Sequence, residues 1–148
     1  MNATSRHLLG AFAVVAVVLT ASAEASAPAG RYTTTGGTVF DTKTKLTWQQ
    51  TAPTAPYAWA AAKIYCQNLT LAGTGWRLPT GKELQTIVDY SQSNPSIDPT
   101  AFPATAATYF WSSSPLAGSP TSAWFVHFFH GDTSASDVPN TRDVRCVR

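Results

Sequence analysis

Two cysteines, Cys66 and Cys146, are the only thiols in this chain of 148 residues. The second lies in the C-terminal run 144–148, eighty positions after the first. The chain also opens with a pattern typical of an export signal, and disulfides persist mainly in exported proteins. Two thiols in such a chain predict one disulfide, which would tie the last strand to the first third of the domain.

Three arginines close to the C-terminus are the candidates for binding a ligand. Arg142, Arg145 and Arg148 recur at every third position. Guanidinium groups match the oxygen geometry of carboxylates and phosphates, so an acidic glycan is the ligand that such a cluster would suit. The alternative is ordinary solvated charge, paired with Asp137 or Asp143.

A serine run and a histidine pair are the other groups that could do chemistry. No Gly-x-Ser-x-Gly elbow surrounds Ser112–Ser114, and serines at a strand end commonly satisfy turn backbone. His127 and His130 with Asp132 would suit a metal, but strand residues three apart point to opposite faces. We therefore expect no catalytic residue, no metal and no cofactor. A hydrolase with a site in the long loop region is the alternative.

The first 23 residues have the pattern of a secretory signal peptide. A positive start at Arg6-His7 precedes the apolar run Leu8–Leu19, and small residues lead to cleavage sites after Ala23 or Ala27. The run is shorter than the roughly 20 apolar residues that span a bilayer. We expect cleavage, a secreted or periplasmic product of bacterial export, and no membrane attachment afterwards.

Length and charge narrow the class of protein further. The chain has ten Lys and Arg residues and eight Asp and Glu residues, which gives a formal net charge of +2. This near balance argues against a nucleic-acid partner, which usually meets a strongly basic surface. The length is enough for one core and too short for two ordinary domains.

The mature chain is predicted to start with a flexible leader. Residues 24–36 are rich in Ala, Ser, Pro, Gly and Thr, which leaves residues 37–148 as the domain. Two apolar stretches, 38–40 and 46–48, then flank a polar turn. This pattern predicts a β-hairpin.

A first helix is expected over residues 57–69. Trp59, Ala62, Cys66 and Leu69 recur at steps of three and four, so they share one helical face. Cys66 is therefore expected to face the core.

A second helix is expected from Thr80 to Tyr90. Thr80 and Glu83 have the spacing of a capping box, in which each side chain satisfies the other residue's backbone N–H. The preceding Trp76–Pro79 would fill the core and set the start of the helix. Arg77 is expected to be mostly buried there, hydrogen-bonded to carbonyls or a carboxylate.

The second half of the chain predicts a long loop and three strands. Three prolines bias residues 91–107 away from helix. Strands are expected over 109–112, 123–129 and 144–147, with a loop over 115–120 and aromatic residues on both faces of the middle strand. The order of elements predicts an α+β fold, in which helices pack on short antiparallel sheets. The tryptophans expected to be structural are Trp48, Trp76, Trp111 and Trp124.

Several of these segments together resemble one family of bacterial secreted domains. The matching runs are Trp76–Thr80 with Glu83, Tyr109–Ser114 and Val144–Arg148, supported by Leu46–Gln49. They resemble the Lcl C-terminal domain family, named after the Legionella collagen-like adhesin, over roughly residues 37–148. The resemblance implies a C-type-lectin-like fold, in which a cysteine of the first helix is often bonded to one in the last strand.

The resemblance also bears on function. The adhesin that names the family is linked to sulfated polysaccharides through a basic surface and a trimer, whereas this chain has no collagen-like stalk. Calcium-binding relatives in the wider fold use a Glu-Pro-Asn turn and a Trp-Asn-Asp run. The only comparable turn here is Val138–Asn140, whose valine has no side-chain oxygen for calcium. We therefore expect calcium-independent binding.

These observations predict a secreted, non-enzymatic binding domain, adhesin-like or carbohydrate-binding. Its expected partner is a glycan or a cell-surface protein. Besides the hydrolase, the alternative is an envelope structural module that binds another protein. The sequence does not indicate an oligomeric state.

Overall fold

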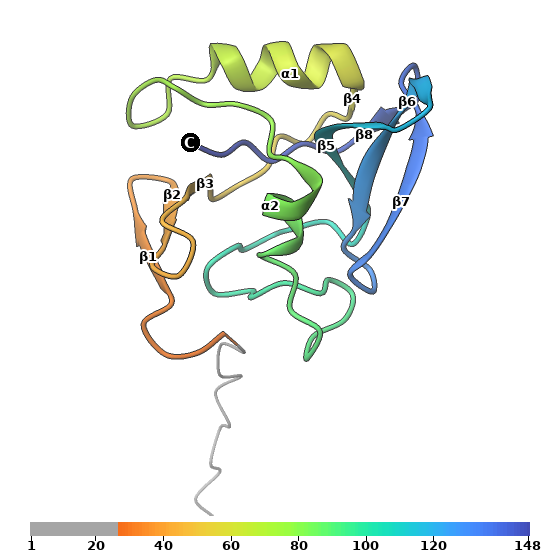
Figure 1. The fold of residues 1–148 in the computed structure, drawn as a ribbon. Helices are drawn as coiled ribbons and strands as arrows, with labels where there is room; N and C mark the ends of the chain where they lie inside the picture. Colours follow the sequence, from red (N-terminus) through yellow and green to blue (C-terminus); the bar gives the residue numbers. More distant parts are fainter. Residues whose placement is uncertain (1–26) are drawn as a thin grey trace, which may run out of the picture.

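The fold combines short antiparallel sheets with two helices, which confirms the expected α+β class (Figure 1). The computed structural model describes residues 27–148, so the expected signal peptide lies outside the described residues. The described strands form two three-stranded antiparallel sheets in which the strands follow their order in the chain, and β4 (Tyr57–Ala58) pairs with β8 (Thr141–Arg142). No helix within the described residues is long and apolar enough to cross a membrane.

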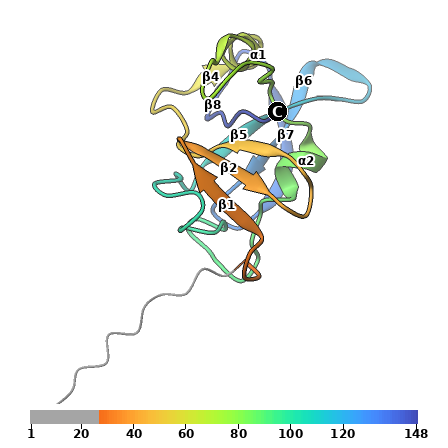
Figure 2. The same ribbon diagram turned by 90° about the vertical axis from the view of Figure 1, so that its left-hand side faces the viewer.

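The first sheet is formed by β1 (Tyr32–Thr35), β2 (Thr38–Asp41) and β3 (Thr47–Gln49). The hairpin of β2 and β3 is confirmed, with Val39 opposite Trp48. Residues 24–36 are expected to form a flexible leader, but residues 32–35 form β1, which pairs with β2 along its whole length. The prediction is therefore wrong for this part of the leader. β1 is rich in threonine and lacks the apolar alternation that predicts a strand. Its backbone pairing with β2 holds it in an extended conformation (Figure 2).

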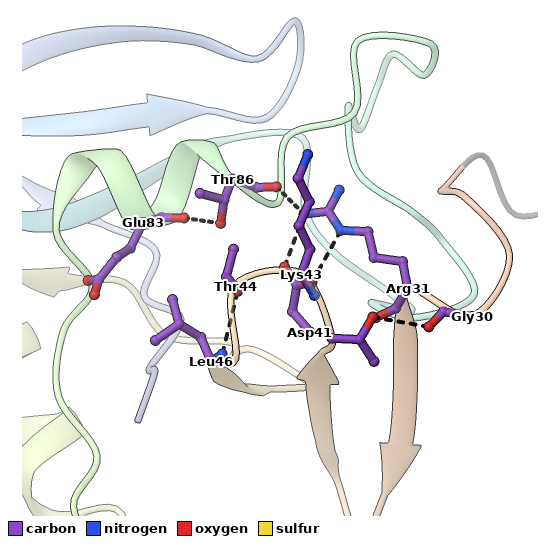
Figure 3. Close-up of polar contacts among 9 residues, drawn as sticks. Gly30, Arg31, Asp41, Lys43, Thr44, Leu46, Glu83 and Thr86 are labelled. Atoms are coloured by element: carbon purple, nitrogen blue, oxygen red, sulfur yellow. Dashed lines mark hydrogen bonds and ion pairs between the residues drawn. The ribbon is translucent and has the colours of Figure 1, made fainter.

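A partly buried ion pair anchors the start of β1. The guanidinium of Arg31 donates to the Asp41 carboxylate at 3.0 Å and to the backbone carbonyl of Thr86 (Figure 3). Burial alone would raise the pKa of Asp41, but hydrogen bonds from Arg31 and from the backbone of Lys43 outweigh it and hold that pKa below its usual value. The pair joins the first sheet to the segment that follows the second helix.

The first helix, α1 (Trp59–Asn68), begins directly after β4 (Tyr57–Ala58). Ala62 and Cys66 are buried on its inner face, as the spacing predicts. Cys66 forms the predicted disulfide with Cys146, and their Cα atoms are 5.4 Å apart.

The second helix, α2 (Gly81–Gln85), is shorter than expected. Both hydrogen bonds of the capping box are present between Thr80 and Glu83. The helix does not continue to Tyr90, because the β-branched run 86–88 follows with tighter i→i−3 backbone bonds.

Loss of the capping hydroxyl gives a direct test of this helix start. The variant Thr80→Ala is expected to lower the free energy of unfolding by about 1 kcal/mol, because the N–H of Glu83 loses its acceptor. Chemical denaturation would measure it, with Thr80→Ser as the control that keeps the hydroxyl. An unchanged midpoint and slope for Thr80→Ala would contradict the role of the cap.

The second sheet is formed by β5 (Tyr109–Leu116), β6 (Ser119–His127) and β7 (Asp132–Asp137). The expected loop over 115–120 is wrong, because β5 and β6 form a hairpin around a turn in which Gly118 has a positive φ. β6 is the central strand of the sheet, the interior position that aromatic residues on both of its faces indicate.

Two details of this sheet differ from the sequence prediction. The expected strand over 123–129 ends at His127, so its last two residues lie beyond β6. β7 was not predicted at all, because its small polar residues show no apolar alternation. It forms by backbone pairing along the free edge of β6.

The C-terminal segment runs between the two halves of the domain. It contains β8 (Thr141–Arg142). The strand expected over residues 144–147 is wrong, because these residues form no regular strand. Backbone groups of Val147 bond to Arg77 on one side, and those of Cys146 and Arg148 bond to β3 on the other. Alternate residues therefore pair with different neighbours.

The core has two parts that meet along this segment. One surrounds Trp48, Leu84 and Phe110, and the other surrounds the disulfide, Trp76 and Trp111. Trp48, Trp76, Leu78, Pro79 and Trp111 are all buried, as expected. Trp124 is the exception, with 37% of its surface exposed.

Candidate functional site

The three C-terminal arginines do not form one ligand-binding surface. Arg145 is completely buried, which rules out the predicted contact between its side chain and a ligand at the surface. It donates to the backbone carbonyls of Gln49 and Gln50 and to the hydroxyl of Thr105. Burial lowers the pKa of Arg145 to about 9, so it stays charged at neutral pH. Its role is structural.

The other two arginines lie over aromatic rings at separate places. The Arg142 guanidinium is 4.7 Å from the ring centre of Tyr109 and 5.2 Å from that of Phe125. The Arg148 guanidinium is 5.0 Å from the ring centre of Trp76. Both are half-buried, because each packs its planar group against a ring.

Arg77 is more exposed than the sequence predicts. Its side chain keeps 45% of its surface in solvent, although it makes the expected hydrogen bonds to a carboxylate, Glu83, at 2.6 and 2.7 Å. Alternation between the buried Trp76 and Leu78 turns the side chain outward. Hydrogen bonds from Arg77 lower the pKa of Glu83 to about 2, so this carboxyl is ionised at neutral pH and is a poor proton donor.

Hydroxyl groups of the serine run form hydrogen bonds with backbone groups of neighbouring elements. The buried Ser112 hydroxyl donates to the carbonyl of Trp124, and the Ser114 hydroxyl accepts from the N–H of Gly81. The roles are structural, as expected, but the expected strand-end position is wrong, because β5 continues to Leu116. The bond between Gly81 and Ser114 joins α2 to the second sheet.

The histidine pair lies at the turn between β6 and β7. Nδ1 of His127 is 3.5 Å from Oδ1 of Asp132, and His127 stacks on Tyr109 with ring centres 4.2 Å apart. In the part of the chain from residue 27 onward, no group of three or more His, Cys, Asp or Glu residues is placed to hold a metal ion.

An open groove between α2 and the second sheet is the candidate functional site. Its volume is about 330 Å³, and the partly exposed indole of Trp124 lies in its wall. The capping box and the bond from Gly81 to Ser114 hold α2 beside the sheet, and backbone pairing in the sheet places β6 next to β7. We call it the Trp124 groove; its lining residues are Gly81, Lys82, Gln85, Ser114, Pro115, Trp124, Phe125 and Thr133.

The Trp124 groove combines an aromatic surface with polar groups that have no other partner. The side chains of Lys82, Gln85 and Thr133 are exposed and form no hydrogen bond or ion pair with another residue between 27 and 148. Among the residues that the structure describes, Lys82 is the only charged one in the lining. This arrangement can bind a ligand with one apolar face and hydroxyl or anionic groups around it.

A larger depression lies along the outer face of α1. Its volume is about 470 Å³, and Ile64, 57% exposed, lies beside Tyr57, Tyr65 and Leu69. No charged side chain within residues 27–148 lines it. Asn68 and Thr70 contribute polar groups to the lining, but without a cation it is less suited to an acidic sugar than the Trp124 groove is.

Comparison with known families now identifies the kind of domain. The Lcl C-terminal domain matches residues 37–148, which is most of the chain. The chain belongs to the Lcl C-terminal domain family. A comparison with curated proteins gives no match. The match confirms the family recognised from the motifs, and it suggests a secreted, adhesin-associated domain.

The groove of this Lcl C-terminal domain was not predicted from its sequence. Its polar groups come from α2, β5 and β7, and β7 itself carries no strand signal. The sequence offers no signal for the groove, because the pairing of Trp124 with a polar strand, which leaves its side chain partly exposed, exists only in the assembled sheet. The sequence predicts a structural tryptophan at this position instead.

Proposed function

We propose that this domain binds a glycan, without chemical conversion, in the Trp124 groove. The observation that carries the proposal is the exposed indole of Trp124 beside the unpartnered side chains of Lys82 and Gln85. The C–H face of a pyranose ring is apolar and packs on an indole, while its hydroxyls need hydrogen-bond partners. The groove offers both kinds of contact in one place.

The charge of the groove favours an acidic sugar. Lys82 contributes a cation, and no carboxylate from residues 27–148 lines the groove. A uronic acid or sulfated unit would therefore find a partner for its anionic group. Such binding needs no calcium, because calcium requires several oxygen ligands at one place. It is expected to weaken as salt rises, because exposed charges are screened over about 10 Å at 0.1 M ionic strength.

The variant Trp124→Ala tests the proposal. It is expected to lower the affinity for a uronic-acid oligosaccharide by about tenfold or more, since a central aromatic contact is lost. Isothermal titration calorimetry of the folded domain would measure it, in chelator, in calcium and across a salt series. The matched control is Phe40→Ala, because Phe40 is also 37% exposed but lies on the first sheet.

Three results would overturn the proposal. Equal loss of binding in both variants would indicate a general effect on the fold. Binding abolished by chelator and restored by calcium would contradict the calcium-independent site. Release of reducing sugar ends or of any cleaved product would favour the hydrolase.

A protein partner is the second candidate, and the depression along α1 favours it. The uncharged lining around Ile64 suits a flat apolar contact better than a sugar. The variant Ile64→Ser would weaken such a partner and leave binding in the Trp124 groove unchanged.

Export and the wider fold also belong to the proposal. The Cys66–Cys146 disulfide supports a secreted or periplasmic location, since such bonds persist in oxidising compartments. It joins the first helix to the C-terminal segment, as in C-type-lectin-like domains, which supports that wider fold. N-terminal sequencing of the exported protein would locate the cleavage site, and an experimental structure would test the fold.

A further inference from the structure

A second depression lies next to the Trp124 groove on the other side of the start of α2. Its volume is about 400 Å³. We call it the Gln67 depression; its lining residues are Lys63, Gln67, Arg77, Leu78, Thr80, Glu83 and Ser113. It therefore brings together α1, the segment before α2, and β5.

The two depressions adjoin because they share the same two chain segments. Thr80 and Ser113 line the Gln67 depression. Their chain neighbours, Gly81 and Ser114, line the Trp124 groove. The N–H of Gly81 bonds to the Ser114 hydroxyl at 3.0 Å, which holds the segments together. These two hydrogen-bonded segments therefore lie between the depressions.

Polar groups without partners line the second depression as well. Gln67 is exposed, and its amide makes no hydrogen bond with another residue between 27 and 148. The same holds for the hydroxyl of Ser113. Lys63 has its ammonium 3.3 Å from the ring centre of Trp59 and forms no ion pair with any residue that the structure describes.

The Arg77 and Glu83 pair gives the depression a rigid floor. Two hydrogen bonds hold the guanidinium against the carboxylate, and that carboxylate also accepts from the backbone of Thr80. The amide of Gln67 and the hydroxyl of Ser113, together with the Lys63 ammonium over Trp59, therefore surround this polar surface. Hydroxyl groups arranged around a sugar ring are suitable partners for such a surface.

We infer that the ligand is a chain of several sugar units that lies across the two segments between the depressions and occupies both depressions. This inference rests on the proposed glycan binding at Trp124. One unit stacks on Trp124, and a later unit of the same chain meets Gln67 and Ser113. Because the second contact is then intramolecular, a longer oligosaccharide gains affinity over a short one without any change at Trp124.

Oligomers of a uronic acid with two, four, six and eight units would test the inference by calorimetry. Affinity is expected to rise by about tenfold between two units and six and then to level off. In Gln67→Ala the six-unit oligomer is expected to lose about threefold or more in affinity, while the two-unit oligomer is unaffected. The matched control is Asn68→Ala, since Asn68 is the exposed neighbour on α1 but lines the depression around Ile64, outside both proposed contacts.

The outcomes separate this inference from the proposed function. If Trp124→Ala weakens every oligomer while affinity does not change with length and Gln67→Ala has no effect, the second contact is wrong and the proposed function stands. Equal weakening by Gln67→Ala and Asn68→Ala would also contradict the second contact. If no oligomer binds, or if Trp124→Ala has no effect, both are wrong.

Discussion

Replacing Arg145 with alanine is expected to lower the free energy of unfolding by about 3–5 kcal/mol. The guanidinium satisfies the carbonyls of Gln49 and Gln50 and the hydroxyl of Thr105, all around a fully buried position. A buried polar group left without its partner costs about 1–3 kcal/mol, and the variant would leave several. Denaturant unfolding would measure the loss as a lower midpoint at an unchanged slope.

Arg148→Ala is the matched control for this variant. Arg148 is the same residue type three positions later, but it is half-buried and lies over Trp76. Its loss is expected to cost about 1 kcal/mol or less, the range of an exposed cation–π contact. If Arg145→Ala kept full stability and lost glycan binding, Arg145 would be a ligand residue after all.

Replacing both Cys66 and Cys146 with alanine is expected to lower the free energy of unfolding by about 4–5 kcal/mol. The disulfide closes a loop with a sequence separation of 80, and the chain-entropy relation gives this value for a loop of that length. Because both cysteines lie in the core beside Trp76 and Trp111, the double variant also avoids leaving a buried free thiol. Thermal and denaturant unfolding would both measure the change.

Reduction provides the control for the double variant. Unfolding of the wild-type domain in reductant is expected to approach that of the double variant, whereas reductant should not affect the variant itself. A wild-type protein with two titratable thiols after denaturation without reductant would contradict the bond. So would equal stability of the two proteins without reductant.

Local sequence patterns were sufficient for the features that depend on nearby residues. The hairpin of β2 and β3, the inner face of α1 and the capping box at Thr80 each follow from spacing within a few positions. The disulfide could also be predicted, because the chain has only two cysteines. The family was recognised because several of its motifs occur in the right order.

Strands without an apolar pattern could not be predicted. β1 is a run of tyrosine and threonine, which strands favour, but it has no apolar alternation, and β7 consists mostly of small polar residues with low strand propensity. Each forms because a neighbouring strand offers unpaired backbone groups, and that neighbour is known only once the sheet is assembled. Because β7 could not be predicted, the wall of the Trp124 groove that contains Thr133 could not be predicted either.

The sequence by itself determined the cross-link, the family and the α+β class, since each depends on residue identity or on order along the chain. Only the tertiary structure decided which cations are available to a ligand. Arg145 and Lys82 are both cationic, yet one is buried among backbone carbonyls and the other is exposed in a groove. Burial depends on which distant segments pack around a residue, and spacing along the chain does not contain that information.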